Sequence, residues 1–365
     1  MALLRELRRF LGESWLNVLL VFVPISIALE VARAPAAWVF ATAALAIVPL
    51  AGLVGQATEA TTEHTGPGLG GLLNATFGNA TELIIGLLAV REGLYAVVKA
   101  SITGSILGNM LLVLGMSALV GGWGRERQIF SRTAAGASAS MLMLAVVALV
   151  MPAAWDLVVT GSLRYTDPTV EALSLLTAVV LLLTYLGSLV FSLVTHRELF
   201  AAVQDQEHRV PAYHLSSAVT LLLGATALAA VEADLLVGAI QPAAVALGLT
   251  ELFIGVVIVG IVGNAAEHFT AIVVAAKGQM ELAFHISIGS SAQVALLVAP
   301  VLVLASLLFG QPMDLVFNPF EIVAIALAVF AVAIVSLDGE TNWFEGLQLV
   351  AVYLVLAIAF YFVPA

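Results

Sequence analysis

Long apolar runs, separated by short polar or glycine-containing segments, extend along almost the whole chain. A helix needs about 20 apolar residues to cross the roughly 30 Å hydrocarbon layer of a membrane. The weakly alternating ten-residue segments typical of membrane β-barrels are not seen in the sequence. We therefore expect an all-α polytopic membrane protein. The pattern predicts about eleven spans, at residues 14–31, 37–58, 69–90, 95–121, 132–152, 169–195, 215–238, 245–275, 281–309, 319–337 and 343–363.

The composition agrees with a membrane location. Hydrophobic residues make up 62% of the chain and charged residues 10%, with a mean hydropathy of +1.10. These values exclude a soluble enzyme, a disordered protein and a nucleic-acid-binding protein, because a soluble fold exposes far more charge. The net charge of −11 also argues against an anionic partner and favours cations. The absence of cysteine excludes thiolate metal sites, and we expect no resident cofactor.

Basic residues predict how the spans are oriented, because cytoplasmic loops carry an excess of Lys and Arg. An N-terminus inside and a C-terminus outside fit their distribution best. The first span follows a basic segment, as a signal peptide does, but no clean cleavage site follows it, so we expect an uncleaved helix. The inner loops then hold Arg5, Arg8, Arg9, Arg125, Arg127, Arg132, Arg197, Arg209 and Lys277, and the outer side holds Arg33, Arg91, Lys99 and Arg164.

One polar stretch divides the chain into two halves. Residues 196–214 (HRELFAAVQDQEHRVPAYH) are predicted to form an amphipathic cytoplasmic linker. Residues 35–195 before it and 215–365 after it are each expected to contain five spans. Residues 1–34 then form an extra N-terminal transmembrane helix.

The two halves share an ungapped sequence match at a spacing of 185 residues. Residues 78–82 read Gly-Asn-Ala-Thr-Glu and residues 263–267 read Gly-Asn-Ala-Ala-Glu. At the same spacing, the Gly-Ser pair at 104–105 matches the pair at 289–290. Five predicted spans, an odd number, separate the copies, so the copies cross the membrane in opposite directions. The sequence therefore predicts an inverted repeat, which many secondary transporters have, with a substrate site where the copies meet.

The repeated motif places an acidic residue within each of two apolar spans. An ionised Glu82 or Glu267 in hydrocarbon costs several kcal/mol unless it faces a cavity or a partner. Asn79 precedes Glu82, and Asn264 precedes Glu267, by three residues, which places each pair on one helical face. Gly78 and Gly263 allow either a helix break or the close approach of another segment.

These groups favour a hard divalent cation. Carboxylate, amide and carbonyl oxygens are the ligands that Ca²⁺ selects, whereas softer metals need His or Cys clusters. Two facing carboxylates carry a charge of −2, which one Ca²⁺ or two protons neutralise. An empty, doubly charged site is disfavoured by desolvation and repulsion, so it should exchange ions rather than leak them.

The paired motifs resemble the α-repeats of the cation/Ca²⁺ exchanger superfamily, and most closely its Ca²⁺/H⁺ antiporter (CAX) branch. The residues that favour this branch are Gly-Asn-Ala-Ala-Glu-His at 263–268, Gly-Ser-Ser-Ala-Gln at 289–293 and the extra first helix. The resemblance implies that Glu82 and Glu267 bind Ca²⁺ and protons, with Asn79 and Asn264 beside them. It also implies that the cavity is lined by Ser105, Asn109, Ser290 and Gln293. The linker is less acidic than in some members, which leaves regulation by that segment open.

Several residues have a second interpretation. Asn79 and Asn264 could cap a helix break instead of binding the ion. The polar residues of the following helices could be interhelical contacts. Glu59 and Glu63 are interpreted as an acidic vestibule, or else as a solvated helix end. For His268, packing or cavity lining is favoured over a proton-linked function.

The expected function is a Ca²⁺/H⁺ antiporter that exports cytosolic Ca²⁺ by alternating access. A Na⁺/Ca²⁺ exchanger is the nearest alternative, followed by a passive cation channel. An intramembrane hydrolase is disfavoured, because no Gly-x-Ser-x-Gly motif occurs. A prokaryotic plasma membrane is the expected location. The partners are Ca²⁺, H⁺ and the lipid bilayer, not nucleic acid, and a homo-oligomer and the preference among divalent cations are left open.

Overall fold

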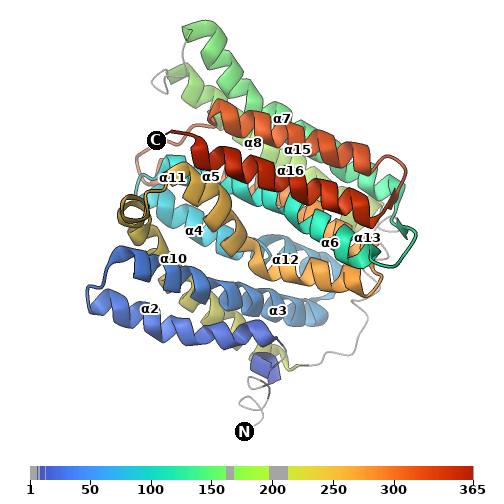
Figure 1. The fold of residues 1–365 in the computed structure, drawn as a ribbon, viewed down its shortest axis with the longest axis horizontal. Coiled ribbons are helices and arrows are strands. Elements are labelled where there is room, and N and C mark those ends of the chain that lie inside the picture. Colours follow the sequence, from blue (N-terminus) through green and yellow to red (C-terminus); the bar gives the residue numbers. More distant parts are fainter. Residues whose placement is uncertain (1–5, 7–8, 13, 162–167, 197–212, 365) are drawn as a thin grey trace.

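The protein is almost entirely helical (Figure 1). A computed structural model describes residues 6, 9–12, 14–161, 168–196 and 213–364, without the side chains of 66–69, 75, 134 and 160. The elements are η1 Trp15–Val21, α2 Phe22–Val31, α3 Ala36–Phe77, α4 Ala80–Arg91, α5 Tyr95–Leu107, η2 Gly108–Val113, α6 Leu114–Gly122, β1 Gln128–Ile129, α7 Arg132–Thr160, α8 Pro168–Val190, η3 Phe191–Thr195, α10 Leu215–Leu247, α11 Glu251–Phe253, η6 Ile254–Val259, α12 Gly260–Ala276, α13 Met280–Gln293, η7 Val294–Val298, α14 Ala299–Leu308, α15 Pro319–Val335, β2 Glu340–Thr341 and α16 Trp343–Phe362.

Within the described part of the chain, eight helices are long and apolar enough to cross a membrane. Two shorter apolar helices, Trp15–Val31 and Pro319–Val335, fall on two further predicted spans. The remaining predicted span, 69–90, is not one helix, because the chain breaks between α3 and α4. The helical membrane fold is therefore as expected, while the span count of eleven stays a prediction.

Helix α3 extends beyond the predicted span 37–58 and bends sharply. A Cβ atom on Gly70 would lie 3.1 Å from the Cβ atom of Thr62. In a straight helix, residues eight positions apart are separated by about 12 Å along the axis. The chain therefore turns back between Thr62 and Gly70, where the sequence contains Gly66-Pro67-Gly68. This segment lies between the predicted spans 37–58 and 69–90, yet the backbone keeps helical geometry through the bend.

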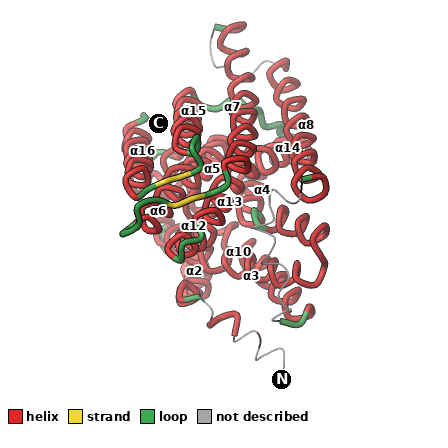
Figure 2. Tube along the Cα trace, turned by 90° about the vertical axis from the view of Figure 1, so that its right-hand side faces the viewer, coloured by secondary structure: helices red, strands yellow, loops and turns green. Residues whose placement is uncertain are grey.

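One short strand pair departs from the all-α expectation. Gln128 pairs with Thr341 and Ile129 pairs with Glu340, antiparallel. Figure 2 shows the two strands side by side on the face turned toward the viewer. They join the loop before α7 to the loop before α16.

The helices lie side by side, with α2 and α3 along one edge (Figure 1). Helices α7, α15 and α16 form the opposite edge, and α4, α5, α6 and α12 lie between them. The central contact is between α5 and the segment η6–α12, where the backbones touch. A Cβ atom on Gly104 would overlap the Val256 carbonyl oxygen, and one on Gly260 would lie 2.6 Å from the Gly104 carbonyl carbon. Only glycine allows this approach.

We expect Gly104→Ala to destabilise the fold by about 1–3 kcal/mol or more, because the new methyl group would overlap the Val256 carbonyl. Thermal unfolding of the purified protein in detergent measures the effect. Gly136→Ala in α7 is the matched control, since nothing lies within 4 Å of its Cβ position. Equal melting temperatures for the two variants would contradict the close contact.

Candidate functional site

The two motif glutamates face each other at the centre of the helical assembly. Glu82 lies in the first turn of α4, and Glu267 lies within α12. A Cβ atom on Gly263 would be 3.5 Å from the Glu82 Cγ atom. A Cβ atom on Gly78 would be 3.8 Å from the Glu267 Oε1 atom. Each glutamate therefore lies against the glycine of the other motif, which brings together segments 185 residues apart in the chain.

The two motifs have different backbones. In the first, α3 ends at Phe77 and α4 begins at Ala80, so the helix is broken at Gly78 and Asn79. In the second, α12 continues from Gly260 to Ala276 without a break at Gly263. Of the two expected uses of these glycines, the structure shows the helix break at Gly78 and the close approach of another segment, the Glu82 side chain, at Gly263.

The break places Glu82 at a favourable position for a negative charge. The first turn of a helix carries free backbone N–H groups and the positive end of the helix dipole. Asn79 is the N-terminal flanking residue of α4, yet its side chain makes no capping hydrogen bond. Its amide instead donates to the Gln293 side chain of α13. Asn264 lies within α12, away from any helix end. The capping interpretation is therefore wrong for both asparagines.

A buried network of amides and hydroxyls joins the two halves. The Asn264 amide donates to the Ser105 hydroxyl at 2.9 Å. The Asn109 amide donates to the Ser290 hydroxyl at 3.1 Å and to the Asn264 carbonyl oxygen at 3.4 Å. All four side chains are buried. The network fixes α5, η2, α12 and α13 relative to one another.

His268 belongs to this network. Its Nε2 atom lies 3.0 Å from the Asn109 Oδ1 atom, and the imidazole is buried. Since Oδ1 can only accept, Nε2 carries the proton and donates. This contact agrees with the packing interpretation. His268 is not among the residues that line the pocket described below.

Two π-helical segments follow the Gly-Ser helices at matching positions. Segment η2 ends at Val113 and η7 ends at Val298, which are 185 residues apart. A π-helical turn holds an extra residue, re-aims the side chains around it and is frequent at functional sites. The sequence match contains this apolar stretch but gives no indication of its helix type. The feature was therefore missed.

Three oxygen atoms at the site have no hydrogen-bond donor among the residues that the structure describes. They are Oε2 of Glu82, Oε2 of Glu267 and Oδ1 of Asn79, each inaccessible to solvent. Buried acceptors without a donor are costly and rare in folded proteins. These atoms can be satisfied by a proton or by a cation.

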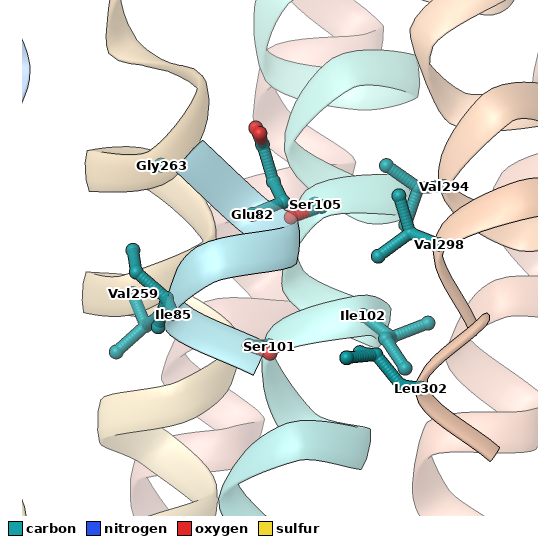
Figure 3. Close-up of a pocket in the computed structure, with 10 residues that line it drawn as sticks. All are labelled: Glu82, Ile85, Ser101, Ile102, Ser105, Val259, Gly263, Val294, Val298 and Leu302. Atoms are coloured by element: carbon teal, nitrogen blue, oxygen red, sulfur yellow. The ribbon is translucent and has the colours of Figure 1, made fainter. Parts of the chain in front are cut away.

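A small pocket lies beside Glu82 (Figure 3). Figure 3 shows Glu82 and Ser105 close to Gly263, with Ser101 one turn of α5 further along the pocket. Ser101 was missed, although its position four residues before Ser105 puts both on one helical face. The other lining residues are apolar: Ile85, Ile102, Val259, Val294, Val298 and Leu302.

Glu59 and Glu63 lie on α3 outside this pocket. Glu59 is exposed and Glu63 is partly buried. The vestibule stays a prediction.

The sequence matches the family described as "Sodium/calcium exchanger protein" over residues 35–194 and 217–362. It is 44% identical to the Ca(2+)/H(+) antiporter of Aphanothece halophytica, covering 95% of this chain and 96% of that protein. It is 46% identical to the Ca(2+)/H(+) antiporter of Synechocystis sp., covering 95% and 97%. The Ca(2+)/H(+) antiporter ChaA of Bacillus subtilis is 42% identical, covering 93% and 96%.

Solved structures share the fold. The structure of native YfkE superimposes with a TM-score of 0.83 at 38% identity, covering 95% of this chain and 100% of that one. The H+/Ca2+ exchanger CAX superimposes with a TM-score of 0.68 at 16% identity, covering 95% and 91%. With matches of this extent in sequence and in structure, the chain belongs to the sodium/calcium exchanger protein family.

Proposed function

We propose that the protein is a Ca²⁺/H⁺ antiporter that exports cytosolic Ca²⁺ with the proton gradient. The observation that carries the proposal is the pair of facing glutamates, each with a buried oxygen that lacks a donor. The matches extend over nearly the whole length of the curated relatives, and the names of these relatives support exchange of the same two ions, Ca²⁺ and H⁺.

Charge explains the coupling. Both carboxylates lie among apolar helices, where a net charge of −2 is strongly disfavoured by desolvation and mutual repulsion. One Ca²⁺ neutralises the pair, and so do two protons. The site therefore changes its exposure from one side to the other only when loaded, which couples the two ions.

The two asparagines differ in function. Ca²⁺ takes six to eight oxygen ligands, including carboxylates, amide carbonyls and water. Asn79 has an unpartnered Oδ1 atom and is a ligand together with Glu82 and Glu267. In Asn264, Nδ2 donates to Ser105 and to the Gly260 carbonyl, and Oδ1 accepts from Asn109. Asn264 is therefore a positioning residue that holds α12 against α5.

The inverted repeat of two five-span halves and the extra N-terminal helix, eleven spans together, belong to the same proposal. The family matches at 35–194 and 217–362 support the proposed halves at 35–195 and 215–365. The matching positions of η2 and η7 support a structural repeat. Residues 1–34 are the extra helix. Of the linker 196–214, residues 197–212 lie outside the described part of the chain.

The loop contacts agree with the proposed division of the loops between the two sides of the membrane. Loops predicted to be cytoplasmic contact one another through β1 and β2 and through Arg125, which donates to the Ala276 carbonyl at 3.2 Å. Loops predicted to be external contact one another through Tyr95, whose hydroxyl donates to the Gln311 carbonyl at 2.6 Å. The excess of basic residues in the first group favours a cytoplasmic N-terminus and an external C-terminus, in a prokaryotic plasma membrane.

Ca²⁺ uptake into proteoliposomes is expected to follow an imposed proton gradient and not an imposed Na⁺ gradient. The reason is that protons bind to the same two carboxylates, while a Na⁺ site needs further oxygen ligands. Uptake driven by Na⁺ would reassign the protein to Na⁺/Ca²⁺ exchange. Uptake with neither gradient would favour a passive channel.

Glu82→Gln and Glu267→Gln are each expected to reduce exchange to the level of protein-free vesicles. Either change removes one negative charge, so Ca²⁺ no longer neutralises the site and a proton-accepting oxygen is lost. Glu171→Gln on α8, where the carboxylate is exposed, is the control and should transport normally. Substantial exchange in either site variant rules out the two-carboxylate mechanism.

Asn109→Ala should lower the apparent Ca²⁺ affinity about 10- to 100-fold, as the loss of outer-shell partners does at metal sites. It should also destabilise the fold by about 1–3 kcal/mol, since Asn264, Ser290 and His268 lose a partner. The control is Ser117→Ala on α6, whose buried hydroxyl has no hydrogen-bond partner among the described residues. Concentration-dependent uptake and thermal unfolding measure both effects, and an unchanged affinity would show that the network is dispensable.

A further inference from the structure

Helix α2, which lies outside the two proposed repeats, is held to α10 by one buried polar contact. Ser26 is the only buried residue of α2, with 0% of its surface exposed. Its hydroxyl meets the carboxyl group of Glu232, which is also 0% exposed. Glu232 lies about halfway along α10, far from either helix end. This carboxyl group is not part of the Glu82–Glu267 site and has no function in the mechanism above.

The hydrogen bonds around Ser26 leave too few protons for an ionised Glu232. The Ser26 Oγ atom lies 2.8 Å from Oε1 and 2.7 Å from Oε2 of Glu232. It also lies 2.8 Å from the Val23 carbonyl oxygen. A hydroxyl has one proton, whereas a carbonyl and a carboxylate can only accept. One proton would have to serve three acceptor oxygens.

A protonated carboxyl group satisfies the contact. The Ser26 hydroxyl then donates to the Val23 carbonyl, and the Glu232 O–H donates to the Ser26 oxygen. In this arrangement the contact between Ser26 and Val23 and the contact between Glu232 and Ser26 each have one donor and one acceptor. A proton on Glu232 therefore lets the Val23 contact and the Glu232 contact of Ser26 both be hydrogen bonds, which an ionised glutamate does not.

No charged neighbour offers an alternative. Among the described residues, Ser26 is the only side chain that hydrogen-bonds to Glu232, and no basic residue forms an ion pair with it. The basic group of α4, Arg91, pairs with Asp234 at 2.8 Å.

The other ionisable groups on the helices around α10 are engaged or exposed. His64 of α3 contacts the Tyr213 carbonyl at 2.8 Å, and Glu251 of α11 accepts from Gln241 at 3.0 Å. Glu30, one turn beyond Ser26 on α2, is exposed. Glu82 of α4 belongs to the ion site, and Glu59 and Glu63 have partners of their own.

We propose that Glu232 is a second proton-binding site, separate from the Glu82–Glu267 pair, and that its proton fastens α2 to α10. When the proton leaves, a buried carboxylate and the Val23 carbonyl compete for the single Ser26 proton. The contact is then relieved by separation of the helices and entry of water. The attachment of α2 is therefore present at lower pH and lost as the pH rises.

Infrared spectroscopy of the full-length protein tests the protonation directly. At neutral pH, Glu232→Gln should remove one protonated-carboxyl C=O band and leave the carboxylate bands unchanged. The matched control is Glu30→Gln on α2, which should reduce the carboxylate bands instead. Loss of carboxylate intensity in Glu232→Gln would show that Glu232 is ionised and would overturn the proposal.

Spin-label distances test the attachment, and the absence of cysteine allows labels at chosen positions. Val31→Cys on α2 and Val245→Cys on α10 are suitable, since these residues are 80% and 85% exposed. The distance distribution should be narrow at acidic pH and broaden at alkaline pH. With Glu232→Gln it should stay narrow at every pH, and with Ser26→Ala it should be broad throughout.

If the distance distribution of the labelled protein with Ser26 and Glu232 intact does not change with pH, the proposed attachment is overturned, whatever the variants do. The attachment is also overturned if the distribution of Glu232→Gln broadens at the same pH as that of the protein with Glu232 intact. Neither the infrared nor the distance measurement depends on ion transport. A failure here is therefore distinguishable from a failure of the proposed Ca²⁺/H⁺ exchange.

Discussion

The repulsion between two carboxylates in an apolar surrounding is the constraint on which the rest of the structure depends. Glu82 and Glu267 come from segments far apart in sequence, and each lies against the glycine of the other motif. The Gly263 Cβ position lies at van der Waals distance from the Glu82 side chain. The network through Asn109 and Asn264 then holds the helices at this separation. An arrangement that keeps two like charges close is stable only when a cation or protons share the site.

Burial of a carboxyl group does not by itself mark the ion site, and the hydrogen-bond partners make the distinction. Glu321 is buried, but it accepts from Thr103 at 3.0 Å and from the Asn318 backbone at 2.9 Å, where it caps α15. Glu232 is buried against the hydroxyl of Ser26. Glu82 and Glu267 each keep an inaccessible oxygen with no donor. The three environments differ accordingly: a helix cap, a contact between helices, and the proposed place for an ion.

The two copies of the motif show how far a repeat in sequence determines local structure. Nearly the same five residues break the helix at 78–82 and continue it at 263–267. Local propensity cannot explain the difference, because both copies contain Gly and Asn at equivalent positions. The surroundings decide: Gly78 follows the sharp bend of α3, whereas Gly263 continues a helix packed against α5. The two glycines therefore serve the same site in different ways.

The sequence by itself determined that this is a helical membrane protein, because apolar length and composition are properties of the chain alone. It also determined the paired glutamates and their polar neighbours, since acidic residues within apolar spans are costly and a repeat at one spacing is not accidental. Only the tertiary structure decided which glycine breaks a helix, that Asn79 and not Asn264 keeps a free oxygen, and that Ser26 meets Glu232. These outcomes depend on which atoms of distant segments become neighbours, and no local pattern encodes such contacts. The π-helical segments are also decided by the tertiary structure, because the same apolar sequence is compatible with an α-helix or a π-helix.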